Sequence, residues 1–126
     1  MKIISSKTHG ILDYVVGVLL IAAPFVFGFA TGGPAQWVPI ILGLGTIAYS
    51  LLTRYELGAI RVLPFGTHLL IDAASGVFLL ASPWLFGFAD QVRAPHVIVG
   101  LLELAVVAMS QTQPGAVSTT PRAAVR

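Results

Sequence analysis

The stretch "AAPFVFGFAT", residues 22–31, recurs as "ASPWLFGFAD", residues 81–90, in a chain of 126 residues. Each copy places a proline near the end of a long apolar run and follows it with Phe-Gly-Phe-Ala. Proline has no backbone N–H and interrupts a helix, so a proline repeated in this setting marks a repeated structural unit. The two copies therefore predict a chain built from one unit used twice.

The repeat extends well beyond this stretch. A shift of 59 positions aligns residues 8–30 with residues 67–89 at 12 identities in 23 positions, and after a gap of two residues Gly43 aligns with Gly100. We expect a single domain over 1–110, with repeat 1 at 8–53, a linker at 54–66 and repeat 2 at 67–110. Each repeat predicts a helical hairpin, and two tandem hairpins have parallel topology, with a pseudo-two-fold axis along the membrane normal.

A lipid bilayer is the solvent that the composition predicts. The chain is 56% hydrophobic and 10% charged, and its mean hydropathy is +0.91, whereas soluble domains carry roughly 25% charged residues. Unbroken apolar runs of ~17–25 residues span a bilayer as helices. We therefore predict an all-α integral membrane fold with four transmembrane helices, the second and fourth short, at about 9–29, 37–52, 67–88 and 95–110.

The charges predict an orientation. A four-helix path places six basic residues on one side and only Arg93 on the other, and the positive-inside rule assigns the richer side to the cytoplasm. Both termini are then cytoplasmic, in the inner membrane, and residues 111–126 form a disordered cytoplasmic tail. The tryptophans fall at the outer interface, the tyrosines near the inner one, and the linker along the inner interface. The residues behind this assignment are Lys2, Lys7, Arg54, Arg61, Arg122, Arg126, Trp37, Trp84, Tyr14, Tyr49 and Tyr55.

The triplet Ser82-Pro83-Trp84, followed by Gly87-Phe88 in the first helix of a hairpin, resembles the SPW-repeat family of small bacterial integral membrane proteins. The resemblance covers residue 8 to about residue 110. Repeat 1 departs from it, with Ala-Pro-Phe at 23–25. The resemblance implies a membrane location and a hairpin fold, and it implies no catalytic residues.

A polar stripe is the main candidate site. His9, Asp13 and Gly17 share one helical face at i, i+4 and i+8, and His68, Asp72 and Gly76 repeat it. Charged side chains in membrane helices avoid lipid, so the stripe is expected to face the bundle interior, where the glycines allow close packing. One interpretation is structural, an Asp near a helix N-terminus bonded to its own His; the other is a cytoplasm-side pocket for protons or a cation.

Glu103 breaks the symmetry, because its counterpart in the first repeat is Thr46. It lies at about the same depth as Asp72, roughly 10 Å from the helix end, so we expect the two carboxyl groups to share one proton. A protonated Glu103 bonded to a neighbouring helix, or paired with His68, is the alternative. His96 is expected at the outer interface.

The proline motif itself predicts a helix-ending device. Pro24 and Pro83 are expected to kink their helices, and Ser82 to donate its hydroxyl to the carbonyl that Pro83 leaves free. Gly28 and Gly87 should end the helices, the next phenylalanine should fold back, and Trp84 should anchor that end in the interface.

No motif predicts an enzyme, a phosphate loop or a metal site, and a bis-histidine haem through His9 and His68 is a minor alternative. The scattered basic residues exclude nucleic-acid binding, and the absence of cysteine excludes thiolate sites. We expect no cofactor and a structural or accessory module, self-associating or bound to another membrane protein. The alternative is a small-ion or proton pathway, or a ligand-binding protein, using Asp13, Asp72 and Glu103.

Overall fold

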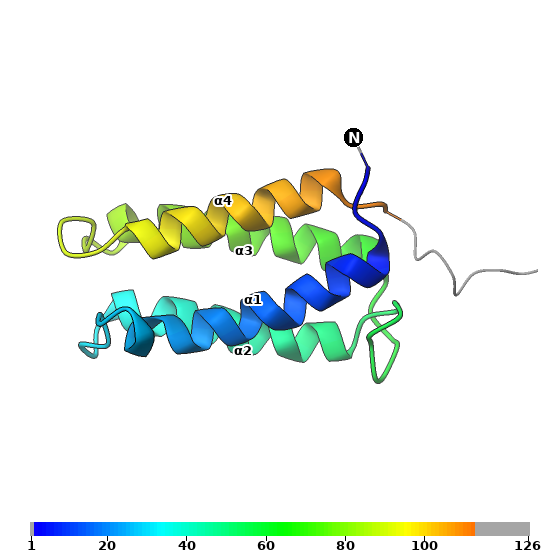
Figure 1. Ribbon diagram of the computed structural model, residues 1–126, viewed down its shortest axis with the longest axis horizontal. Helices are drawn as coiled ribbons and strands as arrows, with labels where there is room; N and C mark the ends of the chain where they lie inside the picture. Colours follow the sequence, from blue (N-terminus) through cyan, green and yellow to red (C-terminus); the bar gives the residue numbers. More distant parts are fainter. Residues whose placement is uncertain (1, 113–126) are drawn as a thin grey trace, which may run out of the picture.

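The computed structural model describes residues 2–112, and within them the chain forms four α-helices and no strand. The helices are α1 (Ser6–Val26), α2 (Pro34–Leu51), α3 (Phe65–Leu85) and α4 (Ala94–Met109). Helices α1 and α2 form one antiparallel hairpin and α3 and α4 form another, and the two hairpins lie one above the other (Figure 1). The predicted all-helical fold is therefore confirmed for these residues.

Local signals explain where the helices begin. Ser5 caps α1 by accepting a hydrogen bond from the Thr8 N–H at 3.2 Å, as N-cap residues do. Helices α2 and α4 carry a proline in their first turn, where the missing N–H costs nothing. Helix α3 starts at Phe65, two residues before the predicted start of repeat 2.

Both long helices end through the repeated motif. Gly28 and Gly87 adopt φ values of +77° and +75°, a left-handed conformation that glycine reaches without strain. The Phe29 N–H then donates to the Pro24 carbonyl, and the Phe88 N–H to the Pro83 carbonyl, each at 2.8 Å. This is the backbone pattern of the Schellman C-cap. Helices α1 and α3 consequently end three residues earlier than predicted, because Phe29 and Phe88 fold back and are buried.

The two prolines differ in how the freed carbonyl is satisfied. Ser82 Oγ donates to the Leu79 carbonyl at 2.7 Å, and Leu79 is four residues before Pro83, the position whose partner proline removes. Position 23 in repeat 1 is alanine, which has no hydroxyl. Trp84 is 59% exposed beside this helix end.

Glycine pairs define the contact inside each hairpin. A Cβ on Gly43 would lie 2.6 Å from the Gly17 carbonyl oxygen, and one on Gly100 would lie 2.9 Å from the Gly76 carbonyl oxygen. The backbones of α1 and α2, and of α3 and α4, therefore meet at distances that only glycine permits. The predicted role of Gly17 and Gly76 is confirmed, and their partners are the glycines of the returning helices.

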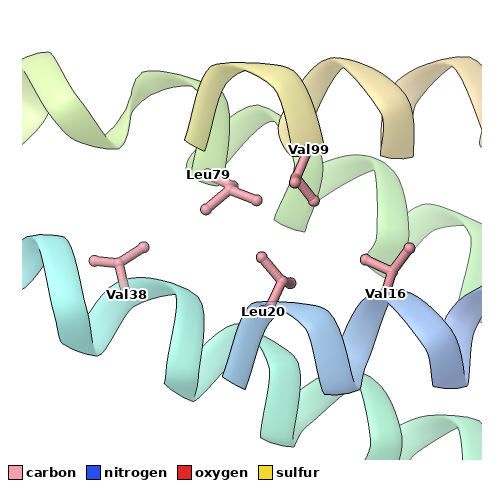
Figure 2. Packing of buried hydrophobic residues seen from close by; sticks show 5 residues of the cluster. All are labelled: Val16, Leu20, Val38, Leu79 and Val99. Atoms are coloured by element: carbon pink, nitrogen blue, oxygen red, sulfur yellow. The ribbon is translucent and has the colours of Figure 1, made fainter. Parts of the chain in front are cut away.

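An apolar seam packs one hairpin against the other. Val16, Leu20 and Val38 rise from the first hairpin toward Leu79 and Val99 of the second (Figure 2). Leu20 and Leu79 are 2% and 0% exposed. The seam occupies the middle of the molecule. Polar side chains replace it toward the end of the bundle that holds the start of α1 and the linker between α2 and α3.

The chain crosses between hairpins at that same end. Residue Ile4, before α1, pairs with Ser110 after α4, and Thr53, after α2, pairs with Leu63 before α3. The two pairings are equivalent under the repeat, since Ile4 matches Leu63 at a shift of 59 and Thr53 matches Ser110 at 57. Apart from residues 111 and 112, the predicted tail lies outside the described residues.

Candidate functional site

Four buried side chains meet between the hairpins. Helix α1 supplies His9 and Asp13, and α3 supplies His68 and Asp72, each pair one helical turn apart on the inward face. They are 1%, 7%, 0% and 6% exposed respectively. The predicted stripe therefore does face the interior, and its two copies face each other. We call these four residues the His/Asp cluster.

The contacts across the hairpins are shorter than those within them. His9 Nε2 lies 2.7 Å from Asp72 Oδ2 and 3.2 Å from Asp13 Oδ1. His68 Nε2 lies 2.9 Å from Asp13 Oδ2 and 3.1 Å from Asp72 Oδ2. Each histidine thus faces both carboxylates, in the reciprocal pattern that an approximate two-fold relation between hairpins produces. The expected contact between each Asp and the His of its own helix is present, and each Asp also lies close to the His of the other hairpin.

The outer nitrogen of each imidazole is held by a hydroxyl group. His9 Nδ1 lies 2.7 Å from Ser110 Oγ, and His68 Nδ1 lies 2.7 Å from Thr53 Oγ1. Each hydroxyl donates its own proton to the carbonyl four residues earlier, Ser110 to Val106 and Thr53 to Tyr49, both at 2.6 Å. A hydroxyl whose proton is used in this way can only accept from the ring. Both Nδ1 atoms therefore carry a proton.

Two tyrosines bind the carboxylates. Tyr55 donates its hydroxyl to Asp13 Oδ2 at 2.7 Å, and Tyr49 donates to Asp72 Oδ1. The sequence predicted that both tyrosines lie in an interfacial belt. Instead, Tyr55 is fully buried, and both hydroxyls point inward to the carboxylates. The linker folds back over the helix ends, and Tyr55 packs there on Phe65 and Leu69. Burial and the nearby Asp13 carboxylate raise the pKa of Tyr55 well above its usual range, so it remains a donor.

Glu103 lies beside the His/Asp cluster without joining it. It shares a cavity of about 20 Å³ with His9, Asp13 and Asp72. Its Oε1 atom is buried and has no hydrogen-bond partner among residues 2–112. The structure therefore places Glu103 next to Asp72, as its depth predicted, but gives it no bond to Asp72 or to His68. The cavity has room for one water molecule, which would satisfy the buried oxygen.

His96 lies in a different environment from the one that the sequence predicts. The sequence placed it at the outer interface, yet it is 1% exposed and its Nε2 donates to the Ala35 carbonyl at 2.9 Å. Its ring lies 5.3 Å from the Phe29 ring and 4.8 Å from the Phe88 ring, between centroids. Because both phenylalanines fold back from the helix ends, they cover a position that would otherwise be open.

Sequence reasoning missed the four residues that surround the cluster: Tyr49, Thr53, Tyr55 and Ser110. One signal was present, because the shift of 57 that aligns Gly43 with Gly100 also aligns the hydroxyl residues Thr53 and Ser110. The tyrosines have no counterpart in repeat 2, where Val106 and Thr112 stand in their places.

No haem fits between the histidines, since each Nε2 lies within 3.2 Å of both carboxylates where a porphyrin would pass.

Fold and site together define a class of protein: a pair of helical hairpins, repeated in sequence and joined through a buried His/Asp cluster. The model of the SPW repeat domain matches residues 7–110, and the chain belongs to the SPW repeat family, whose function is uncharacterised. No curated protein and no solved structure matches the chain. Any activity must therefore be argued from the residues themselves.

Proposed function

We propose that this protein is a four-span integral protein of the cytoplasmic membrane. Helices α1 and α3 are long and apolar enough to cross a bilayer, and α4 is a shorter apolar helix. Large apolar side chains are exposed on the outward faces of all four helices, among them Val15, Val18, Ile41, Leu44, Leu70, Val77, Ile98 and Leu101. Water would not tolerate so continuous an apolar surface, whereas lipid requires one.

The shorter helices are compatible with this arrangement. Helices α2 and α4 have 18 and 16 residues, or about 27 and 24 Å at 1.5 Å per residue. A hydrocarbon core of ~30 Å accommodates such lengths by local thinning and by residues that reach toward the interface. The pseudo-two-fold axis then runs along the membrane normal.

Both termini lie on the cytoplasmic side in this proposal. The residues before α1 and after α4, together with the linker between α2 and α3, gather at one end of the bundle, and the two hairpin loops lie at the other (Figure 1). The first end carries Lys2, Lys7, Arg54 and Arg61, and the second carries Arg93. This distribution supports cytoplasmic termini through the positive-inside rule.

The role that we propose is structural or accessory: a module that associates with itself or with another membrane protein. The observation that carries it is the reciprocal pairing of His9 with Asp72 and of His68 with Asp13. These contacts tie the two hairpins at a buried point, which suits a rigid, defined unit.

Cysteine labelling tests the topology directly, because the chain has no native cysteine. Ala59→Cys in the linker and Gln91→Cys in the second hairpin loop are both exposed positions. In intact cells a membrane-impermeant maleimide should label the Gln91→Cys protein alone, and permeabilised cells should give labelling of both. Labelling of Ala59→Cys in intact cells would reverse the orientation, and release of the protein by alkaline carbonate would reject membrane integration.

The proposed association has its own test. Blue-native electrophoresis and cross-linking in native membranes should give a species larger than the monomer. A monomer alone, with no cross-linked partner, would contradict the structural role.

The unpartnered Glu103 oxygen and the adjoining cavity favour a second candidate, a small-ion or proton pathway through Asp13, Asp72 and Glu103. A pathway needs polar groups that are not locked into permanent bonds, and Glu103 is such a group. Flux in liposomes should then fall when all three residues are replaced by their amides. Unchanged flux in that variant would eliminate this candidate.

A further inference from the structure

We propose that the His/Asp cluster is a binding site for one divalent transition-metal ion. Its ligands are Nε2 of His9, Nε2 of His68 and one carboxylate oxygen each from Asp13 and Asp72. One ligand atom from each of the four residues lies within 4.8 Å of the other three, and all four residues are buried. Two imidazoles and two carboxylates arranged around one point form a donor set that zinc, iron, manganese and cobalt ions accept.

The direction of the histidine rings suits a metal ion. Both Nδ1 atoms donate to hydroxyl groups, so a neutral ring presents the lone pair of Nε2 to the cluster. A lone pair facing carboxylate oxygens is repulsive unless a metal ion or a second ring proton is present, and His9 Nε2 lies at hydrogen-bond distance, 2.7 Å, from Asp72 Oδ2. Moreover, His68 Nε2 makes no hydrogen bond of acceptable geometry among residues 2–112, although two carboxylate oxygens lie within 3.1 Å.

Charge balance is consistent with a divalent ion. Two carboxylates with two neutral imidazoles leave a net charge of −2 in a buried site, which is very costly without compensation. A single divalent cation cancels that charge and satisfies both lone pairs at once. Two additional protons, one on each ring, would also balance the charge, and the experiment below separates these two arrangements.

The groups around the cluster have the form of an outer shell for a metal site. Ser110 and Thr53 hold the histidines, while Tyr55 and Tyr49 hold Asp13 and Asp72. Metal-bound histidines generally donate their other N–H to such a partner, which fixes the ring and its tautomer. Here every ligand residue has one partner of this kind.

An additional coordination position is available beside the cluster. The cavity of about 20 Å³ is lined by His9, Asp13, Asp72 and Glu103 together with Thr46 and four apolar side chains, and one water molecule fits in such a volume. We assign that water to the ion as a further ligand, with the buried Glu103 oxygen as its hydrogen-bond partner. The ion would then also tether α1 to α3, and so one hairpin to the other.

Metal titration of the full-length protein in detergent tests the proposal. After chelation and dialysis, Zn²⁺ or Co²⁺ is added and the stoichiometry is measured by calorimetry and elemental analysis, with the visible absorption of Co²⁺ reporting nitrogen and oxygen ligands. We expect one ion per chain. Stripped wild-type protein that binds less than about a tenth of an equivalent would overturn the proposal and favour two ring protons.

Variants locate the ion. His9→Gln and His68→Gln should each lower the affinity at least ~100-fold, and Thr53→Val, outside the ligand set, by ~10–100-fold. His96→Gln is the matched control, because it replaces another buried histidine at the opposite end of the bundle, and it should bind normally. Unchanged affinity in both cluster variants would overturn the proposal.

Folding is checked separately by helical circular dichroism, so that loss of binding is scored only in folded variants. If neither cluster variant folds, the Thr53→Val protein decides, because Thr53 holds the His68 ring: an affinity lowered ~10–100-fold supports the site, and an unchanged affinity overturns the proposal. None of these measurements depends on membrane orientation. Failure of the metal site would therefore leave the proposed topology standing, and the reverse also holds.

Discussion

Each imidazole of the His/Asp cluster is held at Nδ1 by a buried hydroxyl group, and this restraint explains why hydroxyl residues follow α2 and α4. Thr53 and Ser110 are 0% exposed. Each donates a hydrogen bond from its hydroxyl to a backbone carbonyl of the preceding helix and accepts one from the ring. A buried imidazole N–H that lost this acceptor would remain unpaired, and an unpaired buried donor is far more costly than a missing contact between apolar groups.

Removal of one hydroxyl should expose that cost. In metal-free protein Thr53→Val keeps the shape of the side chain but leaves the His68 Nδ1–H without an acceptor, and we expect a loss of about 1–3 kcal/mol in unfolding free energy. Reversible unfolding by sodium dodecyl sulfate measures it. Thr53→Ser, which keeps the hydroxyl as Ser110 does, should lose less. An equal loss in both variants would show that the methyl group, not the hydroxyl, matters.

The Tyr55 hydroxyl gives a second test. Tyr55→Phe retains the buried ring but removes the bond to Asp13 at 2.7 Å, and hydrogen bonds to charged groups contribute about 1.5–3 kcal/mol. Tyr14→Phe is the control, because its hydroxyl donates to the Leu57 backbone carbonyl from a half-buried position, where about 0.5–1.5 kcal/mol is expected. A control that loses as much as Tyr55→Phe would contradict the assigned charge-assisted bond.

The helix is the scale at which sequence was most informative. The repeated Pro-x-x-x-Gly-Phe predicts the ends of α1 and α3 because its mechanism is local: proline removes a donor and glycine reverses the backbone within five residues. The hydrogen bond from Ser82 to Leu79 follows from the same local reasoning. The linker was beyond such reasoning, because Tyr55 is drawn inward by Asp13, a partner 42 residues away in sequence.

The close crossing of α1 and α2 predicts how two glycine substitutions in α2 affect stability. In Gly43→Ala the new methyl group would lie 2.6 Å from the Gly17 carbonyl oxygen, so the helices must separate. Overpacking of this kind costs about 1–3 kcal/mol. Gly45→Ala, two residues along the same helix, meets no atom within 4 Å, and its better helix propensity should give a change between zero and ~1 kcal/mol of stabilisation. Equal effects on unfolding would reject the close crossing.

The whole molecule combines two kinds of contact between hairpins, an apolar seam in the middle and the His/Asp cluster toward the linker end. Sequence predicted depth along the helices but not the direction in which each side chain points across the bundle. Glu103 lies at the level of Asp72, as expected, yet beside the cluster rather than in it. His96 lies near a helix end, as expected, yet two phenylalanines from different hairpins enclose it. Both differences depend on how the hairpins face each other.

The apolar seam yields a prediction at this scale. Leu79 is 0% exposed and faces Val16 and Leu20 of the other hairpin (Figure 2), so Leu79→Ala should leave a cavity and cost about 2–5 kcal/mol of unfolding free energy. Leu70, on the same helix, is 70% exposed. If the outward face contacts lipid, Leu70→Ala exchanges one apolar surface for another and should cost less than about 1 kcal/mol. A large loss at Leu70 would instead indicate that another protein surface covers this face, which is the outcome that self-association through α3 would produce.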